Sequence, residues 1–314
     1  MKQLILFPFL LLALLTNAQT AKEYYEQAEK SFDSKEYKNA IFLVNQAISM
    51  EGNKADYLLL KGNALFNMKE FESAYKAFTK IIELYPHNTV ALSQRGLLLQ
   101  SIGETDASIQ DFDQALFIEK SDTMRICLYV NRGASKYNSR DFQGAYNDFQ
   151  AAYQLDSLNI GTLNNLAMVC SEIGKGDQTL AYLYKVIAID STVPDSYGNI
   201  GFKYLKMGEY EKAMPFFEKV LKMDPTDALA FNNRGFCRMK LGDLKGAMGD
   251  VNKSIELYPS NSYAFRNRAL IFIEMNKIQD ACNDLQRSSE LGFTKMYGSE
   301  VDDLRTKYCM KKSI

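Results

Sequence analysis

Histidine and tryptophan are almost missing from this sequence of 314 residues. The chain has one histidine, His87, and no tryptophan. A single histidine excludes a metal site built on several imidazoles and leaves room for at most one histidine-dependent catalytic triad. Proline is also scarce, with six residues, so helices meet few interruptions. The composition therefore gives little support to an enzymatic function.

Neither sign of charge is in excess. The chain has 37 Lys and Arg against 38 Asp and Glu, which gives a formal net charge of -1. Partners such as nucleic acid or an anionic membrane need a basic surface that displaces counterions. Hydrophobic residues make up 46% of the chain, enough for a sizeable core. We expect a folded, mostly helical protein that does not bind nucleic acid.

The short motifs of nucleotide and metal chemistry are also missing from the sequence. It contains no Walker loop, dinucleotide fingerprint, zinc-ligand spacing or nucleophile elbow. His87 directly follows Pro86, in a segment that we expect to be a solvent-exposed turn. We predict that the chain is not an enzyme and needs no cofactor or metal.

The first 18 residues resemble a secretory signal peptide. Lys2 provides the positive charge, residues 4–15 form an apolar run of 12, and Ala18 ends a small-residue cleavage site before Gln19. Twelve helical residues extend about 18 Å, too short for a hydrocarbon core of roughly 30 Å. We predict a cleaved signal peptide over 1–18 and a periplasmic or secreted protein without stable membrane insertion; an uncleaved anchor is the alternative.

From Ala21 onward the sequence repeats with a period of 34 residues. Eight units begin at Ala21, Ala55, Thr89, Ile126, Ile160, Pro194, Ala228 and Ser262. Three extra residues, 123–125, precede the fourth unit. Position 8 of every unit is Gly or Ala, and position 20 is Ala, Ser or Thr. Small residues at these two positions allow two helices to approach closely.

Each unit has the hydrophobic spacing of two amphipathic helices. Apolar or small residues recur at positions 4, 8 and 11 and again at positions 17, 20, 24 and 27. Position 15 suits a left-handed turn in five units, with Gly103, Gly174, Gly208, Gly242 and Asn276. Proline at position 32 of three units, Pro86, Pro225 and Pro259, is expected to stop the second helix. The pattern predicts helical hairpins throughout.

This pattern resembles the tetratricopeptide repeat, which has small residues, aromatic residues and proline at corresponding positions. The resemblance covers about residues 21–295 and implies an all-α, right-handed superhelical solenoid over 19–295 that binds a protein or peptide on its concave face. We expect residues 296–314 to cap the open end, with one helix over 299–311 that begins at a capping box of Ser299 and Asp302.

Arginine at position 7 and aspartate at position 23 occur together. The same four units contain both, as Arg95 with Asp111, Arg132 with Asp148, Arg234 with Asp250, and Arg268 with Asp284. The other four units have neither. A guanidinium beside the small position 8 would be partly desolvated and would need a counter-charge. We predict internal ion pairs between the two helices; a row of ligand-binding arginines is the alternative.

Asparagine occupies position 6 in each of the last five units, as Asn131, Asn165, Asn199, Asn233 and Asn267. If the first helices line the concave face, as the resemblance implies, these amides would form a ladder in the groove. An amide side chain both donates and accepts, so it can hold a peptide backbone whatever the peptide's side chains are. Alternatively, these residues cap or bridge the backbone between repeats.

Apolar residues at positions 5, 9 and 12 are expected to flank this ladder. Our candidates for groove contacts are Tyr137, Phe202 and Phe236, together with Val130, Met168, Leu205, Met239, Leu270 and Ile273. Burial in the core is the alternative for these residues. We predict a non-catalytic scaffold of the cell envelope that holds an extended partner segment. The alternative is a structural subunit of an envelope or secretion complex that assembles through its ends or convex face.

Five cysteines in an exported chain cannot all pair within one molecule. Cys282 in the last repeat and Cys309 in the terminal helix are the expected disulfide, because that helix must pack on that repeat. Two free buried thiols are the alternative for this pair. We expect Cys170 and Cys237 to be buried, and Cys127 to be partly exposed.

Overall fold

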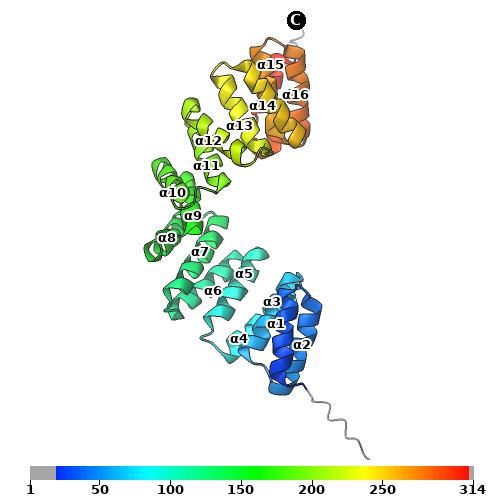
Figure 1. Ribbon diagram of the computed structural model, residues 1–314, viewed down its shortest axis with the longest axis vertical. Helices are drawn as coiled ribbons and strands as arrows, with labels where there is room; N and C mark the ends of the chain where they lie inside the picture. Colours follow the sequence, from blue (N-terminus) through cyan, green and yellow to red (C-terminus); the bar gives the residue numbers. More distant parts are fainter. Residues whose placement is uncertain (1–18, 311–314) are drawn as a thin grey trace, which may run out of the picture. The chain divides into compact units, whose positions relative to one another are not determined.

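The computed structural model describes residues 19–310, so the predicted signal peptide lies outside the described residues. Within that range the chain forms eighteen helices and no strand (Figure 1). The all-α fold predicted from the hydrophobic periodicity is confirmed. Across the same residues, no helix combines the length and the apolar composition needed to cross a membrane.

Sixteen of these helices pair into eight hairpins. The hairpins are α1 (Ala21–Asp33) with α2 (Tyr37–Glu51), α3 (Ala55–Asn67) with α4 (Phe71–Leu84), α5 (Thr89–Ser101) with α6 (Thr105–Ile118), α7 (Asp122–Asn138) with α8 (Phe142–Leu155), α9 (Ile160–Glu172) with α10 (Gly176–Ile189), α11 (Pro194–Lys206) with α12 (Tyr210–Met223), α13 (Ala228–Lys240) with α14 (Leu244–Leu257), and α15 (Ser262–Glu274) with α16 (Ile278–Glu290). Seven first helices begin at the first residue of a 34-residue unit. The exception is α7, which starts one turn before Ile126 and incorporates the three extra residues.

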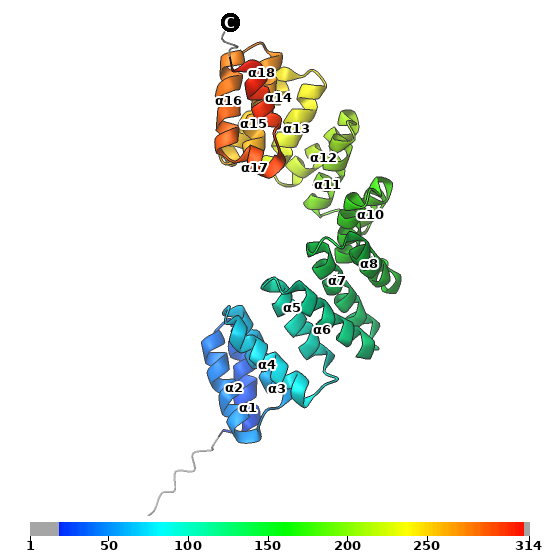
Figure 2. The ribbon, with the colours of Figure 1, turned by 180° about the vertical axis from the view of Figure 1, so that it is seen from behind.

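The chain divides into two compact units, one ending at Leu155 with α8 and the other beginning at Asp156 before α9. Below, the first unit and the second unit are these two parts of the chain, as distinct from the 34-residue repeat units. Within each unit, consecutive hairpins lie side by side, and each second helix also packs against the first helix of the next hairpin (Figure 2). Small side chains at positions 8 and 20 make this close packing possible. The core is therefore a series of layers between neighbouring helices.

Every hairpin turns through a left-handed residue at position 15. Five are the residues predicted from the sequence: Gly103, Gly174, Gly208, Gly242 and Asn276. Three are basic residues, Lys35, Lys69 and Arg140, with φ of 63°, 62° and 65°. The hairpin geometry therefore imposes this conformation even where the side chain disfavours it. At position 32 the prediction also agrees with the structure, because α4, α12 and α14 each end two residues before the proline.

The residue at position 8 is matched to the residue at position 24. Glycine at position 8 faces a buried phenylalanine in four units, as Gly62 with Phe78, Gly96 with Phe112, Gly133 with Phe149, and Gly201 with Phe217. A Cβ atom added to Gly62 would lie 2.5 Å from Cε1 of Phe78. Alanine occurs instead where position 24 is aliphatic, as Ala28 with Val44, Ala167 with Leu183, and Ala269 with Leu285. Gly235, opposite Val251, departs from this rule.

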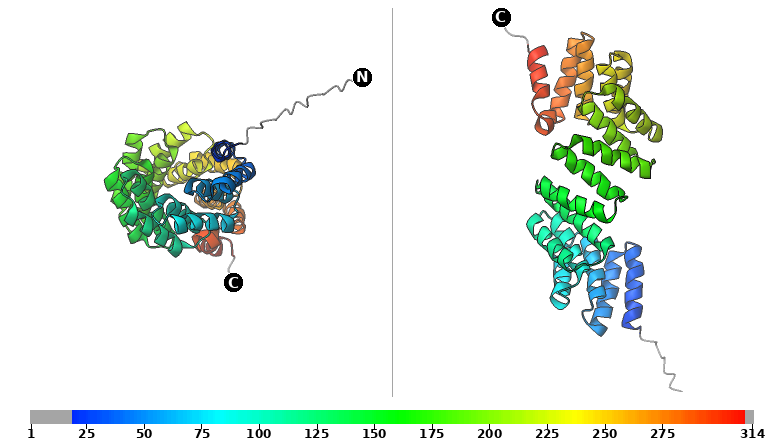
Figure 3. Two further views of the ribbon diagram at one scale, coloured as in Figure 1. Left: turned by 90° about the horizontal axis from the view of Figure 1, so that it is seen from below. Right: turned by 90° about the vertical axis from the view of Figure 1, so that its left-hand side faces the viewer.

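Two short helices, α17 (Phe293–Tyr297) and α18 (Glu300–Tyr308), follow the last hairpin. The right-hand view of Figure 3 shows the final helix, in red, at the end of the stack. Phe293 and Val301 are buried against Ala269, Ala281 and Leu285 of the last hairpin. A disulfide joins Cys282 of α16 to Cys309, with the two Cα atoms 5.6 Å apart. These contacts cover the end of the last repeat.

The predicted helix over 299–311 is present as α18, Glu300–Tyr308, but its predicted capping box is wrong. Gly298, with φ of 96°, separates α17 from α18, and α18 ends at Tyr308. Ser299 has helical backbone angles instead of the extended ones of a typical N-cap residue, so its hydroxyl is not directed at the backbone. That hydroxyl instead donates to Oδ2 of Asp303 at 3.0 Å.

Candidate functional site

All four predicted arginine–aspartate pairs form within single hairpins. In each, Nε donates to Oδ2 and Nη2 donates to Oδ1, at distances between 2.5 and 2.9 Å. Taken as whole residues, the four aspartates are at most 5% exposed. The hydrogen bonds from Arg95 to Asp111 raise the pKa of the Arg95 guanidinium above its usual value. This geometry makes the pairs internal bridges between the first and second helices.

Two of the aspartates have a second cation that sequence analysis missed. Lys136 lies 2.9 Å from Oδ2 of Asp148, and Arg238 lies 2.9 Å from Oδ2 of Asp250. Both cations occupy position 11 of their units. The other two paired units have the apolar Leu99 and Phe272 at position 11. A basic residue at position 11 is therefore the sequence feature that predicts a second cation beside the aspartate.

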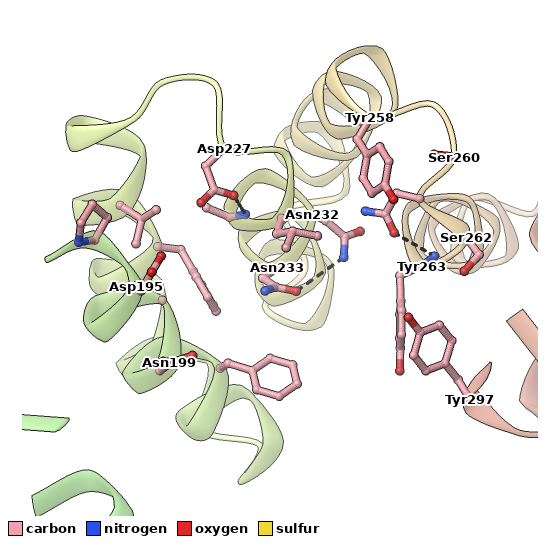
Figure 4. Close-up of a pocket in the computed structure, with 18 of the residues that line it drawn as sticks. Asp195, Asn199, Asp227, Asn232, Asn233, Tyr258, Ser260, Ser262, Tyr263 and Tyr297 are labelled. Carbon is pink, nitrogen blue, oxygen red and sulfur yellow. Dashed lines mark hydrogen bonds between the residues drawn. The ribbon is translucent and has the colours of Figure 1, made fainter. Parts of the chain in front are cut away.

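Two adjoining pockets in the second unit share a wall made by α11. The wall consists of Asp195, Asn199 and Phe202, which line both pockets. The first pocket, the α9–α11 bay, has a volume of about 650 Å³ and is also lined by residues of α9 and α10. The second, the α11–α13 bay, has a volume of about 720 Å³ and is also lined by residues of α12, α13, α15 and α17 (Figure 4). We refer to the two bays together as the groove.

Three of the five predicted asparagines line the groove. Asn165 lines the α9–α11 bay, Asn233 lines the α11–α13 bay, and Asn199 lines both. The Asn199 side chain is exposed and makes no hydrogen bond to another described residue. Asn131 is half-buried on α7, in the other unit, and is not placed with the rest of the ladder.

The prediction for Asn267 is wrong, because this residue is 3% exposed and lies inside the last repeats. Its Nδ2 donates to Oδ1 of Asn232 at 2.9 Å, and its Oδ1 accepts from Nη1 of Arg266 at 2.6 Å. Arg266 is also paired with Glu300 of α18. The terminal helices therefore fix the arginine that covers Asn267, and this ladder position serves the structure.

The three predicted aromatic groove residues differ in their surroundings. Phe202 is 45% exposed on the shared wall. Phe236 lines neither bay; Arg266 lies over its ring at 5.2 Å and Lys240 at 5.4 Å. Tyr137 lies in the first unit and packs against Phe142, with ring centroids 5.2 Å apart. Phe202 is thus the member of this set that the groove exposes.

The remaining apolar candidates divide by their position in the repeat. Met168, at position 9, is 40% exposed and lines the α9–α11 bay. Met239, at position 12, is 7% exposed and belongs to a core cluster. The other candidates, Val130, Leu205, Leu270 and Ile273, are half-buried. In the second unit, position 9 therefore contributes Met168 and Phe202 to the groove, whereas Met239 and Leu205 at position 12 pack toward the second helices.

The aromatic side of the α11–α13 bay was not predicted from the sequence. Tyr263, Phe293 and Tyr297 form an aromatic cluster whose ring centroids are 4.5 to 5.2 Å apart. Tyr263 and Tyr297 line the bay together with Tyr258 (Figure 4). Because Tyr297 lies on α17, outside the 34-residue period, the repeat pattern could not place it.

The thiols and the histidine show no arrangement for catalysis. Cys170 and Cys237 are buried, and burial raises the pKa of Cys237 to about 12. Cys127 and His87 are exposed. Over residues 19–310, no group of three or more His, Cys, Asp or Glu side chains is arranged to hold a metal ion. The chemistry that the groove offers is hydrogen bonding, apolar contact and charge.

Two family models match parts of the chain. The model described as tetratricopeptide repeat matches residues 194–227, which contain α11 and α12. The model described as anaphase-promoting complex, cyclosome, subunit 3 matches residues 33–115. These matches indicate no enzyme family.

Relatives and solved structures agree with the repeat assignment. A TPR repeat-containing protein of Methanocaldococcus jannaschii is 24% identical over 206 residues, which cover 53% of this chain and 36% of that protein. Alignments to this and two further curated relatives cover only 29% to 39% of each relative.

Two crystal structures show the same fold. A tetratricopeptide repeat protein from Parabacteroides merdae has a TM-score of 0.64 at 15% identity, covering 80% of this chain and 98% of that one. YrrB, described as a TPR protein with an unusual peptide-binding site, has a TM-score of 0.52 at 22% identity, covering 62% of this chain and 98% of that one. Residues 194–227 thus match a tetratricopeptide repeat, and the eight units of the chain share its period of 34 residues.

Proposed function

We propose that this tetratricopeptide-repeat protein is a non-catalytic scaffold that binds an extended segment of a partner protein in the groove of its second unit. The observation that carries the proposal is the shared wall on α11. There, the exposed Asn199 amide and the exposed Phe202 ring face both bays. A polar group able to donate and accept thus stands beside an apolar surface, the combination typical of a site for a polypeptide.

The spacing of the asparagines suits an extended chain. Asn165, Asn199 and Asn233 lie on three successive first helices, α9, α11 and α13. Packed helices are about 8 to 10 Å apart, and an extended peptide advances about 3.3 Å per residue. Each amide can therefore meet the backbone of about every third residue of the bound segment. The peptide-binding site described for YrrB, a protein of the same fold, supports this use of the repeats.

We also propose that the protein is exported and acts in the cell envelope. The composition of residues 1–18 supports export. A disulfide between Cys282 and Cys309 is consistent with an oxidising compartment. Expression of the full sequence in a bacterial host, followed by intact-mass analysis of the periplasmic fraction, tests the proposal. A chain that begins at Gln19 is expected, whereas an unprocessed chain in the cytosol contradicts export.

A structural subunit that assembles through its second helices is the alternative. Two side chains favour it, because Phe42 on α2 is 58% exposed and Phe117 on α6 is 86% exposed. Exposed aromatic side chains on second helices are available for contacts with another protein.

A photo-crosslinking amino acid distinguishes the two functions. It replaces Phe202 in one variant and Phe117 in another, and each variant is irradiated with extracts of the native envelope. A covalent adduct formed from position 202 and not from position 117 supports binding in the groove. The reverse result supports assembly through second helices, and failure at both positions contradicts both functions.

A further inference from the structure

We infer that the groove selects a partner segment carrying one basic and one acidic residue about four or five positions apart, with the basic residue in the α11–α13 bay and the acidic residue in the α9–α11 bay. This inference rests on the proposed function, because it specifies the chemistry of the segment that the groove binds.

The α11–α13 bay is negatively charged. Asp195 and Asp227 line it, and no Lys, Arg or His of the described chain is among its lining residues. Asp195 is exposed, and its side chain forms no ion pair or hydrogen bond with another residue of the described chain. Oδ1 of Asp227 accepts from the backbone nitrogen of Ala230 at 2.8 Å, which leaves Oδ2 for a ligand. Both carboxylates can therefore receive a hydrogen bond from a guanidinium or ammonium group.

Aromatic rings add a second attraction for a cation in this bay. Tyr258 and Tyr297 line it and are 49% and 50% exposed. Figure 4 shows these two rings and that of Tyr263 on the side of the bay opposite Asp195. The face of an aromatic ring attracts a cation within about 6 Å of its centre. A Lys or Arg side chain that enters the bay thus meets carboxylates on one side and rings on the other.

An unpaired amide in the same bay points to a ligand independently of the charges. Asn261 lines the bay and is only 6% exposed. Its Oδ1 accepts from the backbone nitrogen of Tyr263 at 3.1 Å, which fixes the orientation of the amide. Its buried Nδ2 has no hydrogen-bond partner among the described residues. Because a buried donor without an acceptor is unfavourable, a carbonyl oxygen of a bound segment would satisfy it.

The α9–α11 bay also contains Asp195, but toward the C-terminal end of α11 it has two cations. Lys203 and Lys206 line it, and neither forms an ion pair with a carboxylate of the described residues. Nζ of Lys206 lies 5.4 Å from the centre of the Phe202 ring, so its ammonium stays beside the shared wall. An Asp or Glu of the partner segment can pair with these two ammonium groups.

The geometry of α11 sets the distance between the two charges of the segment. Asp195 and Lys203 are eight residues apart, or about 12 Å along a helix. The two bays also lie on either side of α11, which adds a lateral offset of about 8 to 10 Å. The two sites are therefore about 15 Å apart, a distance that an extended segment covers in about four or five residues.

Selection from a displayed library of random 12-residue peptides tests the inference with the full chain as the target. We expect enriched peptides to contain a basic and an acidic residue about four or five positions apart. Asp195→Asn should weaken the affinity for such a peptide about five- to tenfold. It should have no effect on the same peptide with its basic residue replaced by glutamine. Lys203→Gln with Lys206→Gln should remove the preference for the acidic residue.

Two matched controls remove charge outside the groove. Asp106→Asn changes the exposed second residue of α6, the position that Asp195 occupies in α11, and Lys222→Gln changes an exposed residue of α12. Neither should alter affinity. Enriched peptides without the charge pair, or equal losses in the control variants, overturn this inference. If binding of such peptides still requires Phe202, the proposed function stands. Failure to enrich any peptide contradicts both.

Discussion

The Arg95 guanidinium donates two hydrogen bonds to the Asp111 carboxylate, from Nε to Oδ2 at 2.8 Å and from Nη2 to Oδ1 at 2.7 Å. The pair joins α5 to α6, and the two side chains are only 16% and 7% exposed. Asp111 forms no ion pair with a second cation of the described chain, whereas the equivalent Asp148 also pairs with Lys136. Replacing the arginine therefore leaves Asp111 without a cation, whereas Asp148 keeps its ion pair with Lys136.

Arg95→Leu should lower the free energy of unfolding by about 3 kcal/mol, because it leaves the Asp111 carboxylate buried without a counter-charge. Arg132→Leu should cost clearly less, since Lys136 still neutralises Asp148. Urea unfolding followed by circular dichroism measures both losses. The double variant Arg95→Leu with Asp111→Leu should recover most of the stability. Equal losses for the single and double variants would contradict the ion-pair account.

Gly96→Ala should destabilise the protein by about 1 to 3 kcal/mol, because the new Cβ would lie 2.9 Å from Cε1 of Phe112. Phe112→Leu alone leaves a cavity. The double variant Gly96→Ala with Phe112→Leu should lose less stability than the sum of the two single losses, since Ala167 with Leu183 is the natural combination in another repeat. Thermal unfolding of the three variants measures this coupling. Strictly additive losses would show that positions 8 and 24 are not matched.

Lys69→Gly should stabilise the protein by up to about 1 kcal/mol, because glycine adopts the left-handed conformation of this residue without steric cost. Gln114→Gly, at an exposed site inside α6, is the control and should cost about 0.5 to 1 kcal/mol. Urea midpoints of the two variants give the comparison. A loss of stability at position 69 similar to that at position 114 would mean that its backbone is not left-handed.

Removing the disulfide by Cys282→Ala with Cys309→Ala should lower stability by roughly 3 to 4 kcal/mol, because the bond closes a loop with a sequence separation of 27. Differential scanning calorimetry measures this loss. Alkylation without reductant should modify three thiols of the unfolded chain. In the native chain at pH 8 it should modify Cys127 alone, because burial raises the pKa of Cys237 to about 12 and shields it. Five modified thiols would exclude the bond.

Asn267→Ala should lower stability by about 1 to 3 kcal/mol, since it removes a partner of both Asn232 and Arg266 inside the protein. Asn199→Ala should change stability by less than about 0.5 kcal/mol. It should instead weaken the binding of a peptide that occupies the groove. Calorimetric unfolding and peptide titration of both variants separate the two roles. A large stability loss from Asn199→Ala with unchanged peptide affinity would assign Asn199 to the structure as well.

Features that depend on the 34-residue period could be predicted from the sequence. The hairpins follow from local hydrophobic spacing, and the four arginine–aspartate pairs join positions that are sixteen residues apart in every unit. The left-handed backbone at Lys35 and Arg140 could not be predicted from side-chain type, because the tight hairpin imposes it. Its recurrence at position 15 in the other units was the available signal.

The groove was predictable only in part, because residues outside the period shape it. Asn267 follows the same pattern as Asn199, yet Arg266 and Glu300 of the terminal segment enclose it. Tyr297 reaches the α11–α13 bay from α17, and this residue lies beyond the last 34-residue unit. The surroundings of side chains in the last repeat depend on the terminal helices, whose sequence does not follow the 34-residue period.

The crystal structure of the full chain bound to a peptide enriched by the groove tests the central claim most directly. The account predicts that the peptide lies extended across α11, with the Asn199 amide bonded to its backbone and its basic side chain between Asp195 and Tyr297. A peptide bound on the second helices, or one that leaves both bays open, would contradict the account.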